Sequence, residues 1–175
     1  MPDAPGLELI RGEIEQDHPG AVLDTSFDRG QPALVVDATQ ILAVLAWLRD
    51  APGQGYRFLS SLHAADDLPA EPRFAVHYEL LNRDRVERLR VKALLSDPAA
   101  GETEQLPEID SCVEFFPTAE FQEREVYDFF GIVFKGHPDL TRILLPEDYV
   151  GWPQRRDFPI GGEPVTFTYN ERNYG

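Results

Sequence analysis

The sequence predicts an α+β fold: a mostly antiparallel sheet with packed helices, followed by an extended, irregular C-terminal arm. Three observations lead to this prediction. Segments whose apolar residues recur at every second position are typical of strands, and they occur before residue 96. Segments with apolar residues three or four positions apart are typical of helices and lie between the strands. After residue 131, prolines and glycines recur too often for a helix or a central strand. We therefore place an α+β domain over residues 1–135 and an extended segment over 136–175.

The N-terminal part of the chain alternates between helix and strand patterns. In chain order we expect a helix at 7–16, strands at 21–27 and 33–36, a helix at 41–50 and a strand at 56–62. Asp37 and Gln40 have the spacing of a capping box and stand just before the second helix. Pro52 and Gly53 are expected to end that helix.

The clearest pattern is a β-hairpin formed by residues 73–81 and 86–95, because apolar and polar residues alternate along both segments. If residues 82–85 form the loop, residue 81 lies opposite residue 86. The expected pairs are then Tyr78 with Leu89, Val76 with Val91, Glu79 with Arg88, and His77 with Arg90. In this register apolar residues face each other on one side of the hairpin, and the other side gains an opposite-charge pair.

The composition limits what the chain can bind. Its formal net charge is −15, so neither nucleic acid nor an anionic membrane is an expected direct partner, because both require clustered Lys and Arg. Cys112 is the only cysteine, which excludes an internal disulfide and an iron–sulfur cluster ligated by this chain alone. We expect Cys112 to be a small buried residue. The N-terminus does not resemble a signal peptide, and no apolar run is long enough to span a bilayer.

A helix is expected at 119–130. Thr118 is a candidate N-cap, and Gly131 is placed to end the helix. On a helical wheel the Phe129 side, which includes Val126 and Phe130, is expected to pack on the sheet. Arg124, Tyr127 and Asp128 fall on the opposite arc. Arg124 and Asp128 are four residues apart, so a simple pair between them is the alternative to an interaction with a partner.

The residues after Gly131 combine two opposing features. Their prolines and glycines prevent regular structure, yet they are too apolar for a free linker. Such a segment is expected to lie across a surface, either of its own chain or of a partner. Arg142, Arg155 and Arg156 have guanidinium groups that suit carboxylates on a facing chain.

Catalytic interpretations of this region are weak. His137 near Asp139 is the one His–carboxylate combination in it, and His-Pro-Asp is more typical of a turn than of a general base. Four scattered histidines and a single cysteine do not form a metal-ligand pattern. No strand is expected before Gly161 and Gly162, so they do not form a phosphate-binding loop. Docking is the function that this region favours.

The same residues resemble a known signature. The run EREVYDFFGI at 123–132 is followed by GHPDL at 136–140, RIL at 142–144, PED at 146–148 and RRDFP at 155–159. This pattern closely resembles that of the C subunit of respiratory complex I, the 30-kDa subunit family of NADH:quinone oxidoreductase. The resemblance extends over residues 7–160. It implies an α+β domain followed by an extended C-terminal segment.

The resemblance also implies a role. Members of this family are peripheral-arm subunits of a proton-translocating enzyme that uses NADH, FMN, iron–sulfur clusters and quinone, and the 30-kDa subunit itself binds no cofactor. The expected partners are subunits D, B and I of the complex. The first of these is large and helps to form the quinone site, so we call it the quinone-site subunit; the other two are the neighbouring iron–sulfur subunits.

The resemblance further implies a location and a set of contacts. The expected location is the cytoplasmic face of the inner membrane, reached only through the complex. The residues expected at subunit interfaces are Arg124, Tyr127, Asp128, His137, Asp139, Arg142, Glu147, Asp148, Trp152, Arg155, Arg156 and Asp157.

Two alternatives remain at this point. The chain could be the equivalent subunit of a related membrane-bound nickel–iron hydrogenase or formate hydrogenlyase, since this subunit does not contact the electron donor. From a different class, it could be a stand-alone soluble hydrolase that uses His137 and Asp139.

Overall fold

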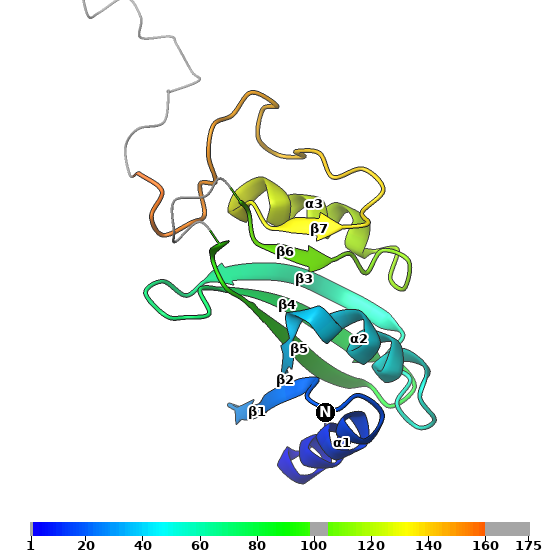
Figure 1. Ribbon diagram of the computed structural model, residues 1–175. Coiled ribbons are helices and arrows are strands. Elements are labelled where there is room, and N and C mark those ends of the chain that lie inside the picture. The colour runs from blue at the N-terminus through cyan, green and yellow to red at the C-terminus, as the bar shows by residue number, and fades with distance from the viewer. Residues whose placement is uncertain (1, 99–104, 160–175) are drawn as a thin grey trace, which may run out of the picture.

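The computed structural model describes residues 2–98 and 105–159, and it confirms the α+β fold (Figure 1). Three helices accompany a five-stranded sheet and a two-stranded sheet in this part of the chain. The helices and the 3₁₀ turn are α1 (Ala4–Asp17), η1 (Ala38–Gln40), α2 (Ile41–Asp50) and α3 (Ala119–Phe130). The strands are β1 (Val22–Asp28), β2 (Gln31–Asp37), β3 (Phe58–Asp66), β4 (Phe74–Asn82), β5 (Glu87–Leu95), β6 (Glu108–Asp110) and β7 (Val133–Lys135).

The large sheet is mixed rather than purely antiparallel. Its strand order is β1-β2-β5-β4-β3, and every neighbouring pair is antiparallel except β2 and β5, which run parallel. A parallel pair needs a long crossover, and here α2 and two strands lie between β2 and β5 in the chain. The sequence predicts the antiparallel character correctly, but local alternation carries no information about this one non-local pairing.

The predicted hairpin exists as β4 and β5, but its predicted register is wrong by two positions. Asn82 lies opposite Glu87, so Tyr78 faces Val91 and Glu79 faces Arg90. The side chains keep their predicted faces, because a shift of two residues restores the alternation. The loop is displaced by one residue because Asn82 is part of the ladder. Its side-chain oxygen accepts a hydrogen bond from the backbone N–H of Arg85 at 2.9 Å.

The hydrophobic core lies between one face of the sheet and the helices α1 and α2. The helices contribute Leu7, Ile10, Ile14, Val44, Leu45 and Leu48, and the sheet contributes Leu34, Val36, Val76, Tyr78, Leu80, Leu89 and Val91; all are buried. Burying each such aliphatic side chain stabilises the fold by about 1.5–3 kcal/mol. This packing fixes the orientation of the strands that carry the site described below.

The N-terminal ends of α1 and η1 differ in detail from the sequence prediction. Helix α1 begins earlier than predicted because Asp3 caps it, accepting a hydrogen bond from the N–H of Gly6 at 2.8 Å. Asp37 caps η1 by accepting from the N–H of Thr39. Gln40 does not complete a capping box, since its amide donates to the carbonyl of Pro19 instead.

Helix α3 lies along the outer edge of β3 (Figure 1). The side chain of Thr118 donates to the carbonyl of Leu59 at 3.0 Å, and the side-chain oxygen of Gln122 accepts from the N–H of Leu62. Thr118 occupies the predicted N-cap position of α3, but its side chain does not make the expected capping bond, because its hydroxyl bonds to the edge strand. Because the carbonyl of Leu59 and the N–H of Leu62 are already bonded to α3 and its N-cap, another chain cannot pair with β3 at these positions.

The short strands β6 and β7 pair in parallel beside α3. The formation of β7 contradicts the expectation that regular structure ends at Gly131. Strands of three residues are too short to show an alternation in sequence. From residue 136 to residue 159 the chain has neither helix nor strand. The division at residue 135 stays a prediction, and residues 160–175 of the predicted arm lie outside the described part of the chain.

Candidate partner interface

Helix α3 supports the candidate interface, and its buried side differs from the predicted one. Val126 and Phe130 are buried in the core, whereas Phe129 is only half-buried. Asp128, which the helical wheel places on the polar side, has an exposed fraction of 0%. The wheel fails here because the irregular segment 136–159 covers a second side of the helix, and a wheel assumes a single buried face.

The carboxylate of Asp128 binds three consecutive backbone N–H groups of this segment. Its Oδ2 accepts from Ile143 at 3.1 Å, from Leu144 at 2.7 Å and from Leu145 at 2.9 Å. Its Oδ1 accepts from Nη1 of Arg142 at 2.8 Å. An irregular backbone has no ladder partners, so these bonds satisfy groups that would otherwise be costly to desolvate.

The electrostatics of Asp128 favour the ionised form. Burial by itself would raise the pKa of Asp128, but the hydrogen bonds from Leu145, Arg142, Leu144 and Ile143 outweigh burial and lower the pKa below its ordinary value. Removing one partner of such a buried pair costs about 3–5 kcal/mol, because the other charge is left without compensation. Asp128 therefore anchors the segment to α3.

Arg142 connects distant parts of the segment to each other. Its Nη1 binds Asp128, and its Nη2 donates to the carbonyls of Tyr149 at 3.0 Å and Gly151 at 3.1 Å. Its guanidinium also lies over the ring of Trp152, with 4.5 Å between Cζ and the ring centroid. The guanidinium of Arg142 is thus engaged within its own chain rather than free to bind a carboxylate of a facing chain.

Trp152 in turn explains why the helix ends at a glycine. Gly131 has a φ of +67° and closes α3 with a hydrogen bond from its N–H to the carbonyl of Tyr127. A methyl group on Gly131 would lie 2.5 Å from the Trp152 ring. Tyr127 packs edge-on against the same ring, with 5.3 Å between centroids. The prediction that Gly131 ends the helix is confirmed, and the packing of Trp152 is a second reason for glycine.

Arg124 does not pair with Asp128, which was the alternative considered from the sequence. Its Nε donates to the carbonyl of Thr141 at 3.1 Å, and its Nη2 donates to Oγ1 of Thr141 and to the carbonyl of Arg142. One turn of the helix away, Asp128 binds the neighbouring residues of the segment. The two side chains therefore bind consecutive parts of the same backbone.

His137 forms part of the turn that begins the segment. Its Nε2 lies 2.9 Å from the carbonyl of Glu120, and its Nδ1 accepts from the N–H of Asp139 at 3.0 Å. These partners correspond to a neutral ring with the proton on Nε2. Both ring nitrogens are engaged with backbone groups, which gives His137 a positioning role in the turn.

A second anchor holds the other end of the segment. Arg73, at the start of β4, is buried and binds Asp66 through two hydrogen bonds of 2.9 and 2.7 Å. The same guanidinium binds Asp97 at 2.7 Å and Asp157 of the segment at 2.8 Å. Burial would raise the pKa of Asp66, but the bonds from Arg73, Arg156 and Leu68 lower it to about 2.

Arg155 and Arg156 also bond within the chain. The Nε of Arg155 donates to the carbonyl of Phe130 at 2.6 Å. The backbone N–H of Arg156 donates to Asp66 at 2.8 Å, and its Nη1 donates to the carbonyl of Leu68 at 2.6 Å. Arg155 thus fastens the end of the segment to the end of α3, whereas Arg156 fastens it to Asp66 and to the loop that follows β3.

Several side chains of the segment remain exposed. Among its apolar residues, Leu144 is 61% exposed and Val150 is 89% exposed. The acidic residues of the segment that are exposed are Asp139, Glu147, Asp148 and Asp157. We call the surface formed by Leu144, Val150, Glu147 and Asp148 the segment surface. It offers apolar groups and carboxylates on a backbone that Asp128 holds at residues 143–145 and that Arg142 holds at Tyr149 and Gly151.

Comparison with known proteins identifies the family. The family model described as "Respiratory-chain NADH dehydrogenase, 30 Kd subunit" matches residues 34–164. The chain belongs to this family. The match includes both anchors and the whole described segment.

Relatives with the same family signature cover most of the chain. It is 44% identical to the C subunit of NADH-quinone oxidoreductase from Herpetosiphon aurantiacus over 144 residues, which are 82% of this chain and 80% of the relative. It is 43% identical to the protein of the same name from Roseiflexus castenholzii, over 87% of this chain and 84% of the relative. The names of these relatives support a function in a respiratory NADH dehydrogenase that uses quinone.

The fold of the 30-kDa subunit recurs in a solved structure of the membrane-bound sulfane sulfur reductase, an archaeal respiratory membrane complex. The TM-score is 0.66 at 24% identity, covering 87% of this chain and 85% of the other. This likeness concerns the fold alone. Among residues 2–98 and 105–159, no helix is long and apolar enough to cross a bilayer.

The structural roles of two groups of buried side chains were missed by the sequence prediction. Glu123 is fully buried and accepts hydrogen bonds from the N–H of Cys112 at 2.8 Å and from Ser111 at 2.6 Å, so it fixes the loop beneath α3. Burial raises the pKa of Glu123. Arg73 and Asp66 were missed because the predicted third strand ended at residue 62. Extending that strand to Asp66 would have placed the two charges at adjacent strand ends.

The chemistry available to the described part of the chain is limited. In it, no group of three or more His, Cys, Asp and Glu residues is arranged to hold a metal ion. Cys112 is buried, and burial raises the pKa of its thiol well above the usual value, which disfavours the thiolate needed for nucleophilic chemistry. The arrangement is suited to presenting a surface.

Proposed function

We propose that this chain is a subunit without a redox centre in the peripheral arm of a proton-translocating NADH:quinone oxidoreductase. In this role it docks on the quinone-site subunit and supports assembly of the complex. The observation that carries the proposal is the segment surface. Leu144 stands on backbone whose N–H groups are held by the buried carboxylate of Asp128. Val150 stands between Tyr149 and Gly151, whose carbonyls are held by Arg142.

Order within the segment lowers the cost of binding a partner. A flexible segment loses conformational freedom when it binds, and that loss reduces the affinity. Here Asp128 and Arg142 already order the backbone around Leu144, while Arg73 orders its far end through Asp157. A partner that covers Leu144 and Val150 would bury apolar surface without the loss of conformational freedom that a flexible segment suffers.

The charges of the segment surface indicate what the partner should provide. Glu147 and Asp148 are exposed beside the apolar residues. A complementary partner surface would be apolar with Arg or Lys at its rim. We expect this surface on the quinone-site subunit, with the iron–sulfur subunits as further neighbours and with the chain at the cytoplasmic face of the inner membrane.

The cysteine content of the chain excludes electron transfer through an iron–sulfur cluster that this chain ligates alone. A thiolate-ligated iron–sulfur cluster requires several cysteines, and the sequence contains only Cys112, which is buried. In the proposed role, FMN, the iron–sulfur clusters, NADH and quinone are bound by other subunits. The names of the relatives, subunits of NADH-quinone oxidoreductase, support this assignment.

The direct test replaces both exposed apolar residues of the segment surface. We expect Leu144→Asp combined with Val150→Asp to leave folding of the isolated chain unchanged and to reduce the amount of assembled complex on native gels. NADH:quinone activity of the membranes should fall in proportion. The matched control is Leu9→Asp, because Leu9 on α1 is 70% exposed and lies far from the segment in the chain. Equal assembly of the double variant and the control would refute docking through this surface.

A related complex with another electron donor is the second candidate, because the fold also occurs in an archaeal respiratory membrane complex. The composition of the purified native complex separates the two. A flavoprotein subunit that oxidises NADH supports the first assignment, whereas nickel in the complex supports a hydrogenase-type machine.

A further inference from the structure

The two edges of the large sheet differ in what covers them. At one edge, α3 and its N-cap bond to the carbonyl of Leu59 and the N–H of Leu62 on β3. At the other edge lies β1, and no strand from the described part of the chain pairs with its outer side (Figure 1). An uncovered edge presents a row of backbone N–H and C=O groups that fits another strand. A partner strand would therefore extend the sheet on the outer side of β1.

The register of β1 shows which of its backbone groups point outward. Asp28 and Gln31 flank a two-residue turn in which both residues have positive φ, and the residues that flank such a turn exchange both hydrogen bonds. The N–H and C=O groups of Phe27 and Thr25 then point away from β2. Two observations agree: Pro32, opposite Phe27, has no N–H, and the N–H of Thr25 donates to the preceding carboxylate at 2.8 Å. Phe27 thus offers a donor and an acceptor to a strand outside.

Two large apolar side chains are exposed on β1. Leu23 is 52% exposed and sits at the bulge between Val22 and Asp24, and Phe27 is 44% exposed. Bulges and charges on an edge are devices against unwanted pairing, but an exposed aromatic ring is not. A strand paired with the regular part of β1 would cover the Phe27 ring, and burial of apolar surface favours association.

The charges beside this edge are negative. Asp24 and Asp28 face the same side of the sheet, since they lie opposite Val35 and Gln31 of β2. This side carries no helix from the described part of the chain, and we call it the open face. Neither β1 nor β2 contains Lys or Arg. Arg29 of the turn lies 3.8 Å from Asp28, but their side chains are 90% and 86% exposed, so solvent weakens this pair.

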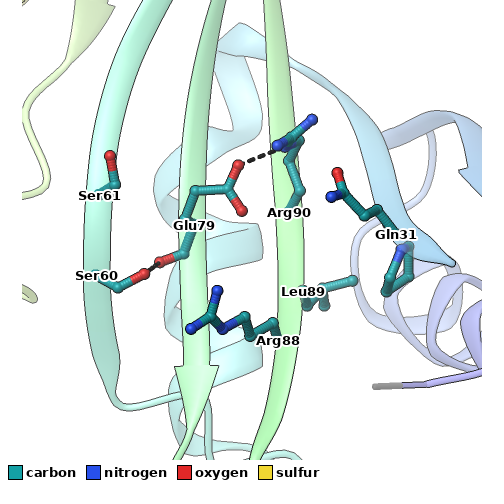
Figure 2. Close-up of a pocket in the computed structure, with 8 residues that line it drawn as sticks. Gln31, Ser60, Ser61, Glu79, Arg88, Leu89 and Arg90 are labelled. Atoms are coloured by element: carbon teal, nitrogen blue, oxygen red, sulfur yellow. Dashed lines mark hydrogen bonds and ion pairs between the residues drawn. The ribbon is translucent and has the colours of Figure 1, made fainter. Parts of the chain in front are cut away.

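The cations of the open face lie further from this edge, on β5. Arg88, Arg90 and Lys92 alternate along that strand, which is separated from β1 by β2. With about 4.8 Å between neighbouring strands, the backbones of β1 and β5 are roughly 10 Å apart. Figure 2 shows Arg90 turned towards Glu79 on β4, and Lys92 pairs with Asp67 at 3.3 Å. The open face as a whole is mixed in charge, whereas its β1 edge is acidic.

The charges at the edge distinguish between possible occupants. If the β1 strands of two copies of this chain paired in antiparallel fashion, both copies of Asp24 and Asp28 would lie on one face, and like charges on neighbouring strands oppose pairing. A strand of another polypeptide with Lys or Arg four positions apart would instead place a cation opposite each carboxylate. An apolar residue on the other face of that strand would cover Phe27.

We propose that the outer side of β1 pairs with a strand of another subunit of the complex, in which Lys or Arg lies opposite Asp24 and Asp28. The five-stranded sheet would gain one strand from this partner. This interface is separate from the segment surface. It rests on membership of a family of multi-subunit enzymes and not on docking to the quinone-site subunit.

Hydrogen–deuterium exchange resolved to single amides tests the pairing. The N–H of Phe27 points outward, so we expect it to exchange about tenfold more slowly in the purified complex than in the isolated chain. The N–H groups of Ser26 and Asp28 point towards β2 and serve as internal controls, because their exchange should change less. No slowing at Phe27, or the same slowing at all three amides, would overturn the proposal.

A charge reversal tests the chemistry of the partner. Asp28→Lys should lower the fraction of this chain recovered in the complex about tenfold, because it places like charges opposite each other. Asp84→Lys is the matched control, since Asp84 carries the same charge on the turn between β4 and β5 and is also exposed. Thermal unfolding of the isolated chain should be the same for both variants. Equal recovery of the two variants in the complex would contradict the proposed pairing.

A photo-crosslinking residue in place of Leu23 identifies the occupant. The expected product joins this chain to a peptide of another subunit that has Lys or Arg four positions apart. Replacing the cation opposite position 28 with Asp should then restore recovery of Asp28→Lys. Crosslinks to a second copy of this chain, to lipid, to a peptide without these cations or to no polypeptide would each overturn the proposal. Because Leu144 and Val150 are unchanged in these variants, failure here is distinguishable from failure of the segment surface.

Discussion

At the scale of single residues, Asp128 connects the family signature to the fold. A carboxylate that accepts three backbone N–H groups and one guanidinium replaces the ladder that an irregular segment lacks. Sequence alone indicated that Asp128 and Arg142 matter, because both stand in the signature. It could not indicate that they bind each other, since 14 positions separate them in the chain, β7 lies between them and no single periodicity applies.

Glycine replacements test the contact between α3 and Trp152. Gly131 and Gly136 both have positive φ, of +67° and +81°, but only Gly131 lies against a side chain, the ring of Trp152. Gly136→Ala should cost about 1–2 kcal/mol from backbone conformation alone. Gly131→Ala should cost about 1–3 kcal/mol more, because the methyl group displaces Trp152.

Urea unfolding of the two glycine variants gives the comparison. The fluorescence of Trp152, measured in a Trp47→Phe background, should change in Gly131→Ala and stay like the parent in Gly136→Ala. If the two variants had equal free energies of unfolding and both kept the Trp152 emission of the parent, the position of the Trp152 ring would not depend on Gly131.

At the scale of elements, the sequence patterns predicted the buried side correctly for strands that are buried on one face. They failed for the helix that is covered on two sides. The alternation of β4 and β5 predicts their faces correctly because one side of the sheet is apolar, but the turn at Asn82 sets the register. The wheel for α3 predicts Val126 correctly. It places Phe129 on the correct side, since Phe129 is partly buried against the core. It misplaces Asp128, because the segment covers a side of the helix that the wheel assigns to solvent.

The segment itself should be released by acid. The pKa of Asp66 is lowered to about 2, and the pKa values of Asp128 and Asp157 are also lowered by their partners. A lowered pKa in the folded state means that the stabilisation is complete above the ordinary value of 3.8 and is lost as the pH falls towards 2. Glu123 acts in the opposite sense, because its raised pKa keeps it neutral and stabilising at low pH.

We therefore expect two separate acid transitions. Trp152 fluorescence, in the Trp47→Phe background, should report release of the segment between about pH 4 and pH 2. Far-ultraviolet circular dichroism should report loss of the core helices only at lower pH. A single transition seen by both probes at the same pH would show that the segment and the core unfold together.

At the scale of the whole molecule, the described part of the chain consists of a sheet with helices on one face, an open face on the other side and a segment anchored along α3 (Figure 1). The class of the fold could be predicted from local patterns, because helices and antiparallel hairpins are local. The parallel pairing of β2 with β5, the burial of Arg73 and the path of the segment are set by contacts between distant residues, which no single-sequence pattern records. The resemblance to the family, rather than these patterns, carried the functional prediction.

Hydrogen–deuterium exchange on the isolated chain and on the purified complex tests most directly whether a partner covers the segment surface in the assembly. We expect amides near Val150 and Glu147, whose side chains are exposed in the isolated chain, to exchange more slowly in the complex. Amides of the core strands should exchange at the same rate in both samples. Unchanged exchange rates for residues 144–150 on assembly would contradict docking through this surface.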